Sequence, residues 1–130
     1  MKKVILKIIF GLVMFNTLAY SQTIELENET KLVEVKAFSL KSTDGDIVSL
    51  SDYKGKFVVV HIATTWCPYC NAEAPYLEEI YKEYHGKNVE VLIIDVKEPR
   101  DLVHERIKNR FNLSFPVLLD TNGAVAASFA

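Results

Sequence analysis

Hydrophobic and polar positions in the middle of the chain predict a strand, a helix and a second strand. The segment 57–63 (FVVVHIA) is a nearly unbroken apolar run, which predicts a central strand covered on both faces, with His61 as its only polar side chain. The run 89–96 (VEVLIIDV) predicts another buried strand. Between them, apolar residues recur at helical spacing until a stop at His85-Gly86: Tyr76, Leu77, Ile80, Tyr81 and Tyr84. This order predicts a right-handed parallel crossover.

Weaker patterns flank this unit on both sides. Before it, apolar residues around a turn at 44–46 predict a hairpin, and the segment 51–55 predicts one capped helical turn. After it, Pro99 begins a helix with His104 on its outer face and with these residues on its inner face: Leu102, Val103, Ile107 and Phe111. The segment 117–119 predicts a third strand, and the segment 124–130 predicts the start of another helix.

The beginning of the chain has the pattern of an export signal. Met1-Lys2-Lys3 precedes the apolar run 8–18 and small residues at 19–21, so we expect a signal peptide over residues 1–21, cleaved before Gln22. The polar segment 22–37 is expected to be a tether or a short edge segment, and residues 38–130 to be the folded domain. Export would place the protein in the periplasm, where disulfides are permitted. Its only expected contact with a membrane is the signal segment, if that stays uncleaved.

Composition narrows the function classes. A chain of 130 residues with 49% hydrophobic content has room for one domain with a core. The net charge of −2 and the scattered basic residues argue against a nucleic-acid partner. The two cysteines, Cys67 and Cys70, are too few for a disulfide framework or a four-cysteine zinc site, and we expect no metal. An intramolecular disulfide must join these two. So short a ring restrains the unfolded chain little, which favours a redox role over stabilisation of the fold.

The C-x-x-C pair comes at the junction between the predicted strand and helix. Trp66-Cys67-Pro68-Tyr69-Cys70 follows the apolar run and opens the amphipathic segment. A thiol in the first turn of a helix meets unpaired backbone N–H groups and the positive end of the helix dipole, and both stabilise a thiolate. The pattern therefore predicts a dithiol redox centre.

In this setting the chain resembles the exported TlpA/ResA-like branch of the thioredoxin superfamily. The resemblance extends roughly from residue 38 to the end and is carried by the Asp44-Gly45 hairpin, the segment 50–56, the strand 57–63, the motif 66–70, Glu73, Pro75 and the segment 115–120. It implies a thioredoxin-like α/β fold, with a three-layer arrangement of a sheet between helices on both faces and an N-terminal hairpin extension.

The resemblance and the position of the motif imply a role for each of its residues. Cys67 would be the low-pKa nucleophile that attacks a substrate disulfide, and Cys70, one turn further on, would resolve the mixed disulfide. Pro68 suits the first helical turn because its missing N–H costs nothing there. Tyr69 would tune the stability of the thiolate, and Trp66 belongs to the same motif.

Two titratable residues are candidate supporting groups. The family places a glutamate close to the thiols at the position of Glu73, which could exchange protons if it is buried; an ordinary exposed carboxylate is the alternative. His61 aligns with the strand position where thioredoxins carry a buried aspartate, and it could carry the proton of Cys70. A histidine bonded only to backbone explains its presence equally well.

The chain departs from the family at its end. TlpA-like proteins continue beyond a segment like 124–129 into a loop with a cis-proline, two antiparallel strands and a final helix, so we expect a C-terminally truncated chain. The competing interpretation makes Pro116 the cis-proline and the segment 117–119 the strand after it.

The expected function is exported thiol–disulfide exchange, with reduction of protein disulfides in cytochrome c maturation or envelope redox homeostasis. The resemblance implies no organic cofactor, a protein disulfide as substrate, an upstream membrane electron donor and a monomeric state. A peroxiredoxin is a competing hypothesis because of Thr64 before Cys67, although Val60 stands where its motif needs proline. A copper-binding chaperone and an inactive fragment of a longer redox protein also compete with the expected function.

Overall fold

A computed structural model describes residues 34–130 of the chain. The expected signal peptide and most of the polar tether lie outside the described residues. The elements are β1 (Ser39–Ser42), β2 (Ile47–Ser49), the 3-10 helix η1 (Leu50–Tyr53), β3 (Phe57–Ala63), α2 (Pro68–Tyr84), β4 (Val89–Val96), α3 (Arg100–Val103), the π-helix η2 (His104–Asn109), β5 (Val117–Asp120) and α4 (Ala124–Ala127).

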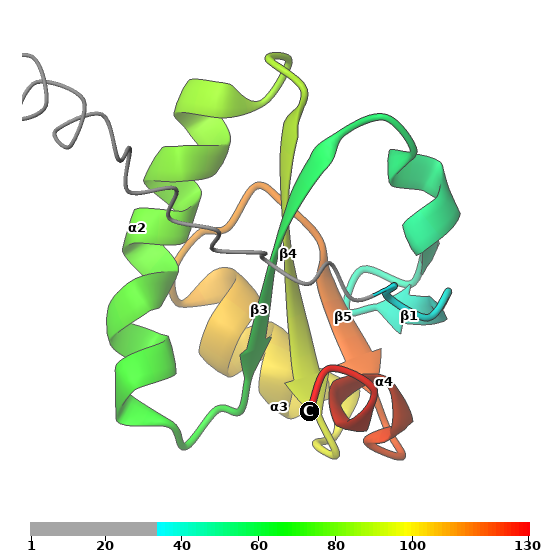
Figure 1. Cartoon of the computed structure of the whole chain (residues 1–130). Coiled ribbons are helices and arrows are strands. Elements are labelled where there is room, and N and C mark those ends of the chain that lie inside the picture. Colours follow the sequence, from blue (N-terminus) through cyan, green and yellow to red (C-terminus); the bar gives the residue numbers. More distant parts are fainter. Residues whose placement is uncertain (1–33) are drawn as a thin grey trace, which may run out of the picture. The chain divides into compact units, whose positions relative to one another are not determined.

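One mixed sheet organises these elements, with the strand order β2-β1-β5-β4-β3. Strands β3, β4 and β5 are parallel, and β1 pairs antiparallel with both β5 and β2 (Figure 1). In the β3–β4 register His61 lies opposite Ile93, and Ala63 lies opposite Asp95. The predicted hairpin and the parallel β3-α2-β4 crossover are confirmed. The arrangement is the expected thioredoxin-like α/β fold.

Two apolar clusters cover the two faces of the sheet, because side chains alternate between the faces along each strand. On one face, Val91, Ile93 and Val117 of the sheet pack with Leu77 of α2 and Ile107 of η2. A cluster on the opposite face joins the strands to η1 and α4, and its members include Phe38, Leu92, Ile94, Leu118, Tyr53 and Val125. The helices therefore lie on both faces, as in the expected three-layer arrangement.

The position of β3 corrects the sequence-based prediction of a central strand covered on both faces. Among residues 34–130, β3 pairs only with β4 and forms one edge of the sheet. Its burial is partial: Phe57 is 79% exposed, and Val59 and Ile62 are each 37% exposed. The apolar run does form a strand, but such a run does not tell how many neighbouring strands it has.

The helical segment after β4 also differs from a regular helix. The α-helix α3 passes directly into η2, where the Arg110 N–H donates to Glu105 O and the Leu113 N–H donates to Lys108 O, each five residues back. Val103 and Ile107 are buried as predicted, whereas Leu102 is exposed. Because Val103 and Ile107 face the sheet, the neighbouring Leu102 points away from it.

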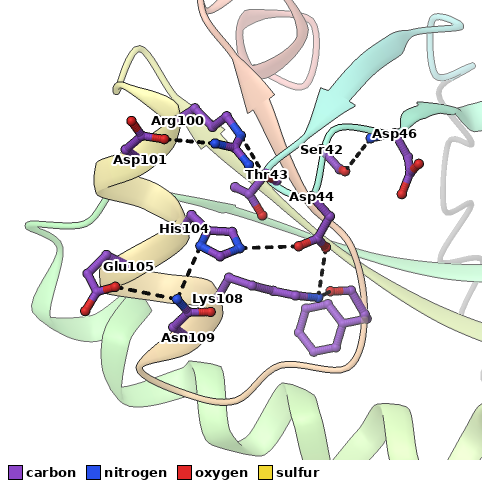
Figure 2. A network of polar contacts seen from close by, with 11 residues as sticks. Ser42, Thr43, Asp44, Asp46, Arg100, Asp101, His104, Glu105, Lys108 and Asn109 are labelled. Atoms are coloured by element: carbon purple, nitrogen blue, oxygen red, sulfur yellow. Dashed lines mark hydrogen bonds and ion pairs between the residues drawn. The ribbon is translucent and has the colours of Figure 1, made fainter.

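Charged side chains tie the β1–β2 turn to α3 and η2 (Figure 2). Asp44 lies 3.4 Å from His104 Nε2 and 3.4 Å from Lys108 Nζ, and the Arg100 Nε donates to Thr43 O at 2.8 Å. Lys108 also donates to Phe115 O. His104 therefore lies against the turn, and its predicted place on the outer face of the helix is wrong.

Pro116 immediately precedes β5. All peptide bonds of residues 34–130 are trans, so the interpretation of Pro116 as a cis-proline is wrong. Its carbonyl accepts from the Ile93 N–H in the middle of β4. In the register Val117, the first residue of β5, lies opposite Ile93, two residues before Asp95, which lies opposite Ala63 at the end of β3.

Candidate redox site

The dithiol lies where β3 passes into α2, at the carboxyl end of the parallel strands. β3 ends at Ala63, Cys67 is the N-cap of α2, and Pro68 is the first helical residue. The Cys67 Sγ accepts a hydrogen bond from the Cys70 N–H at 3.2 Å. A sulfur held against the N–H groups of a helix N-terminus is stabilised as thiolate when the dithiol is reduced. The geometry therefore supports Cys67 as the nucleophile.

Cys67 and Cys70 form a disulfide, with 5.3 Å between their Cα atoms. Both side chains are half-buried. Cys70 also packs against the cluster that contains Ala63 and Leu77, and its Sγ lies 4.0 Å from Ile62 O. Cys67 thus begins the helix, and Cys70 borders the core one turn further along. This placement agrees with a nucleophile and a resolving cysteine.

Two aromatic side chains of the motif lie in solvent beside the disulfide. Trp66 is 75% exposed and Tyr69 is 83% exposed. Large apolar side chains at such exposure are available to a partner. They flank Cys67 on both sides in sequence.

The two candidate proton carriers lie side by side on the α2 face of β3. His61 Nδ1 lies 3.4 Å from Glu73 Oε2, while His61 Nε2 is buried and makes no hydrogen bond with the described residues. The histidine side chain is 16% exposed, whereas that of Glu73 is 63% exposed. Glu73 is therefore an exposed carboxylate, and it contacts the more buried His61.

Sequence patterns did not reveal a pair of side chains that hold the loop before Cys67. Glu98, in the β4–α3 loop, accepts from the Thr65 N–H at 2.6 Å and from the Thr65 hydroxyl at 2.7 Å. The Asn71 side chain, in the first turn of α2, donates to Thr65 O at 3.0 Å. The backbone and hydroxyl groups of Thr65 are thus fixed from two sides, two residues before the nucleophile.

Asp95, at the carboxyl end of β4, was predicted only as part of an apolar strand. It is 1% exposed, and neither of its carboxyl oxygens makes a hydrogen bond with the described residues. Burial, followed by the neighbouring Glu98, raises the pKa of Asp95 to about 8. The available signal was its position, because the carboxyl ends of parallel strands share one edge and the C-x-x-C loop leaves that edge.

The described part of the chain contains no group of three or more His, Cys, Asp or Glu side chains able to hold a metal ion. Among the same residues, no helix is long and apolar enough to cross a membrane.

A sheet that delivers a C-x-x-C pair to a helix N-terminus defines a thioredoxin-like protein of the thiol–disulfide oxidoreductase class. Residues 33–130 match the AhpC/TSA family, and the chain belongs to that family. The thiol–disulfide oxidoreductase ResA of Geobacillus thermodenitrificans is 30% identical over 132 residues, covering 98% of this chain and 75% of the relative. ResA of Bacillus subtilis is 37% identical over 71% of this chain and 51% of its own length.

A solved structure gives the same result. A secreted disulfide oxidoreductase of Mycobacterium tuberculosis, homologous to Escherichia coli DsbE, superposes with a TM-score of 0.64 and 27% identity. The match covers 71% of this chain and 66% of that structure. The fold and the family are thereby established, and the chain spans about half the length of the Bacillus subtilis relative.

Proposed function

We propose that the protein is an exported thiol–disulfide oxidoreductase that reduces protein disulfides, in cytochrome c maturation or in envelope redox homeostasis. The observation that carries the proposal is the Cys67–Cys70 pair at the start of α2, with the Cys67 Sγ held by the Cys70 N–H. The ResA relatives support the reaction class. The secreted Mycobacterium tuberculosis homologue supports export.

In the proposed reaction the reduced dithiol passes two electrons to the substrate. The Cys67 thiolate attacks one sulfur of the substrate disulfide, which forms a mixed disulfide and releases the first substrate thiolate. Cys70 loses its proton and attacks the Cys67 Sγ, which forms the Cys67–Cys70 disulfide and releases the second substrate thiolate. Two protons from the protein and solvent complete the two substrate thiols.

A dithiol donor must then reduce the Cys67–Cys70 disulfide, since each turnover leaves it oxidised. We propose a membrane protein as this donor, a monomeric state for the chain, and no cofactor other than the disulfide itself. The exposed Trp66 and Tyr69 provide the surface on which a protein substrate or donor would lie.

The test is trapping of the mixed disulfide with the full chain and insulin as a model protein disulfide. The Cys70→Ser variant keeps the nucleophile without the resolving thiol, so we expect it to form a covalent adduct that dithiothreitol releases. The matched Cys67→Ser variant should form far less adduct, and the unsubstituted protein should reduce insulin catalytically. Equal adduct formation by both variants, or no reduction of insulin, would contradict the proposal.

The same variants distinguish the competing functions. Consumption of peroxide by Cys70→Ser, without adduct formation, would favour a peroxidase. Retention of one equivalent of Cu(I) against a competing chelator, lost in both variants, would favour a copper-binding chaperone.

A further inference from the structure

Thr65 is the best-anchored residue of the loop that leads to the nucleophile. Its N–H and hydroxyl both donate to the Glu98 carboxylate, at 2.6 and 2.7 Å, and its carbonyl accepts from Asn71 at 3.0 Å. The next contact along the loop is the Cys67 N–H, which donates to Thr64 O at 3.2 Å. A displacement of Thr65 would therefore be passed to Cys67 and to the first turn of α2.

Glu98 contacts this loop from the segment that follows β4, the strand paired with β3. β4 ends at Val96, and in the register Asp95 lies opposite Ala63, the last residue of β3. Side-chain alternation places Asp95 on the face of Val91 and Ile93, where Cys70 packs. Asp95 and Glu98 thus lie together behind the C-x-x-C loop, one fully buried and the other partly exposed.

Among residues 34–130, Asp95 has no cation as a partner. Glu98 lies in its own loop, His61 on β3 contacts Glu73 of α2, and the dithiol is at the start of α2. Three basic side chains of α3 and η2 contact Asp44 or Thr43 of the β1–β2 turn (Figure 2). They are Arg100, His104 and Lys108. With its pKa at about 8, Asp95 is mostly protonated at neutral pH.

The protonation of Asp95 and the hydrogen bonds between Glu98 and Thr65 depend on each other. Two ionised carboxyl groups at this partly buried position would repel each other, since no cation among residues 34–130 lies between them. Ionisation of Asp95 would therefore weaken the hold of Glu98 on Thr65. This coupling makes the loop before Cys67 sensitive to a proton on a residue outside the C-x-x-C motif.

We infer that Glu98 is a positioning residue for the redox reaction: it fixes Thr65, and thereby Cys67, and the buried Asp95 behind the same loop controls how firmly it does so. The inference deepens the proposed function and rests on it for its catalytic consequence. The structural part, a hydrogen bond at Thr65 that follows the charge of Asp95, stands independently of any substrate.

The structural part is tested by NMR on the oxidised full chain, which needs no exchange activity. The carboxyl carbon of Asp95 and the amide proton of Thr65 should shift with one common midpoint near pH 8. In Asp95→Asn the step at the Thr65 amide should vanish, and in Glu98→Gln the Asp95 midpoint should fall. A Thr65 amide shift that stays constant through the Asp95 titration, or an unchanged step in Asp95→Asn, would overturn the inference.

The catalytic part compares two substitutions of one residue. In Glu98→Gln the amide oxygen can still accept from the Thr65 N–H and the amide can donate to the Thr65 hydroxyl, so positioning is kept without the charge. Glu98→Ala removes both contacts. We expect Glu98→Ala to slow the reaction of Cys67 with a small disulfide on the order of tenfold, with Glu98→Gln nearer to the unsubstituted protein.

Glu79→Ala, an exposed carboxylate on α2, is the matched control for Glu98→Ala and should keep the original rate. The pH dependence of the rate should also lose its step near pH 8 in Asp95→Asn, a change that simple destabilisation does not produce. Equal rates for Glu98→Ala and Glu79→Ala would overturn the positioning role. If the unsubstituted protein exchanges no disulfides, the proposed function fails, while the NMR titration still decides the coupling.

Discussion

The two ends of β4 carry buried carboxylic acids in opposite environments. Near the start of the strand, Glu90 receives a hydrogen bond from Lys56 at 2.8 Å and contacts His85 at 3.1 Å. Burial alone would raise its pKa, but these partners hold the pKa of Glu90 below its usual value. At the end of the strand, Asp95 has no such partner among the described residues, and its pKa is raised to about 8.

The acid at the start of β4 has partners that stabilise its charge. The acid at the end of β4, next to the C-x-x-C loop, has none among the described residues. A buried acid that has a cation and hydrogen-bond donors contributes to folding, whereas a buried acid without partners costs free energy. Perturbed acids of the second kind gather at functional sites. The C-x-x-C loop leaves the sheet at the end that holds Asp95 and not at the end that holds Glu90.

Asp95→Asn should have the largest effect on the pH dependence of stability. In the unfolded chain an aspartate ionises near pH 4, but in the folded protein Asp95 keeps its proton to about pH 8. Its contribution to folding is therefore fully present below the unfolded pKa and is lost as the pH rises through the folded pKa. Linkage gives a loss of roughly 4 kcal/mol between pH 4 and pH 7.

Urea unfolding of the oxidised protein at several pH values measures this effect. Relative to Asp95→Asn, the unsubstituted protein should be most stable near pH 4 and should lose that advantage steadily toward pH 8. Parallel stability curves for the two proteins would show that Asp95 ionises normally in the folded state, and the contrast with Glu90 would disappear.

Glu90→Gln should have a smaller effect of the opposite pH sign. Because the folded pKa of Glu90 is depressed, its contribution is present above the unfolded pKa and is lost as the pH falls through the folded pKa. We expect a loss of about 1.5–3 kcal/mol at pH 7, the range for hydrogen bonds to a charged group. The two proteins should become equally sensitive to urea below about pH 4; a constant difference at all pH values would mean that shape, not charge, matters at this position.

The sequence predicted the redox centre better than its surroundings. The C-x-x-C pair could be recognised because an apolar strand, the motif and an amphipathic helix follow one another without interruption. The local sequence pattern is therefore enough to place Cys67 and Cys70 at the start of a helix. Glu98 and Thr65 are 33 residues apart, and only the register of β3 and β4 brings them together. The hydrophobic pattern of a sequence does not give the pairing of strands, so the contact between Glu98 and Thr65 could not be predicted.

The errors have similar physical causes. The valine-rich run predicted β3 correctly but not its place at the sheet edge, since an apolar run reports burial propensity and not the number of neighbouring strands. Helical spacing predicted Val103 and Ile107 in the core but could not anticipate η2, which starts at His104 and alters the later spacing. The position of His104 was predicted from the spacing within its own helix, but its side chain contacts Asp44 in the hairpin turn, which is distant in sequence.

The most direct test of the central claim is the pKa of the Cys67 thiol in the reduced full chain. The rate of alkylation by iodoacetamide would be followed against pH, with the modified cysteine identified by mass spectrometry. We expect Cys67 to react first, with a pKa well below the free-cysteine value of about 8.5. A pKa near that value, or faster alkylation of Cys70, would contradict the claim that the start of α2 activates Cys67.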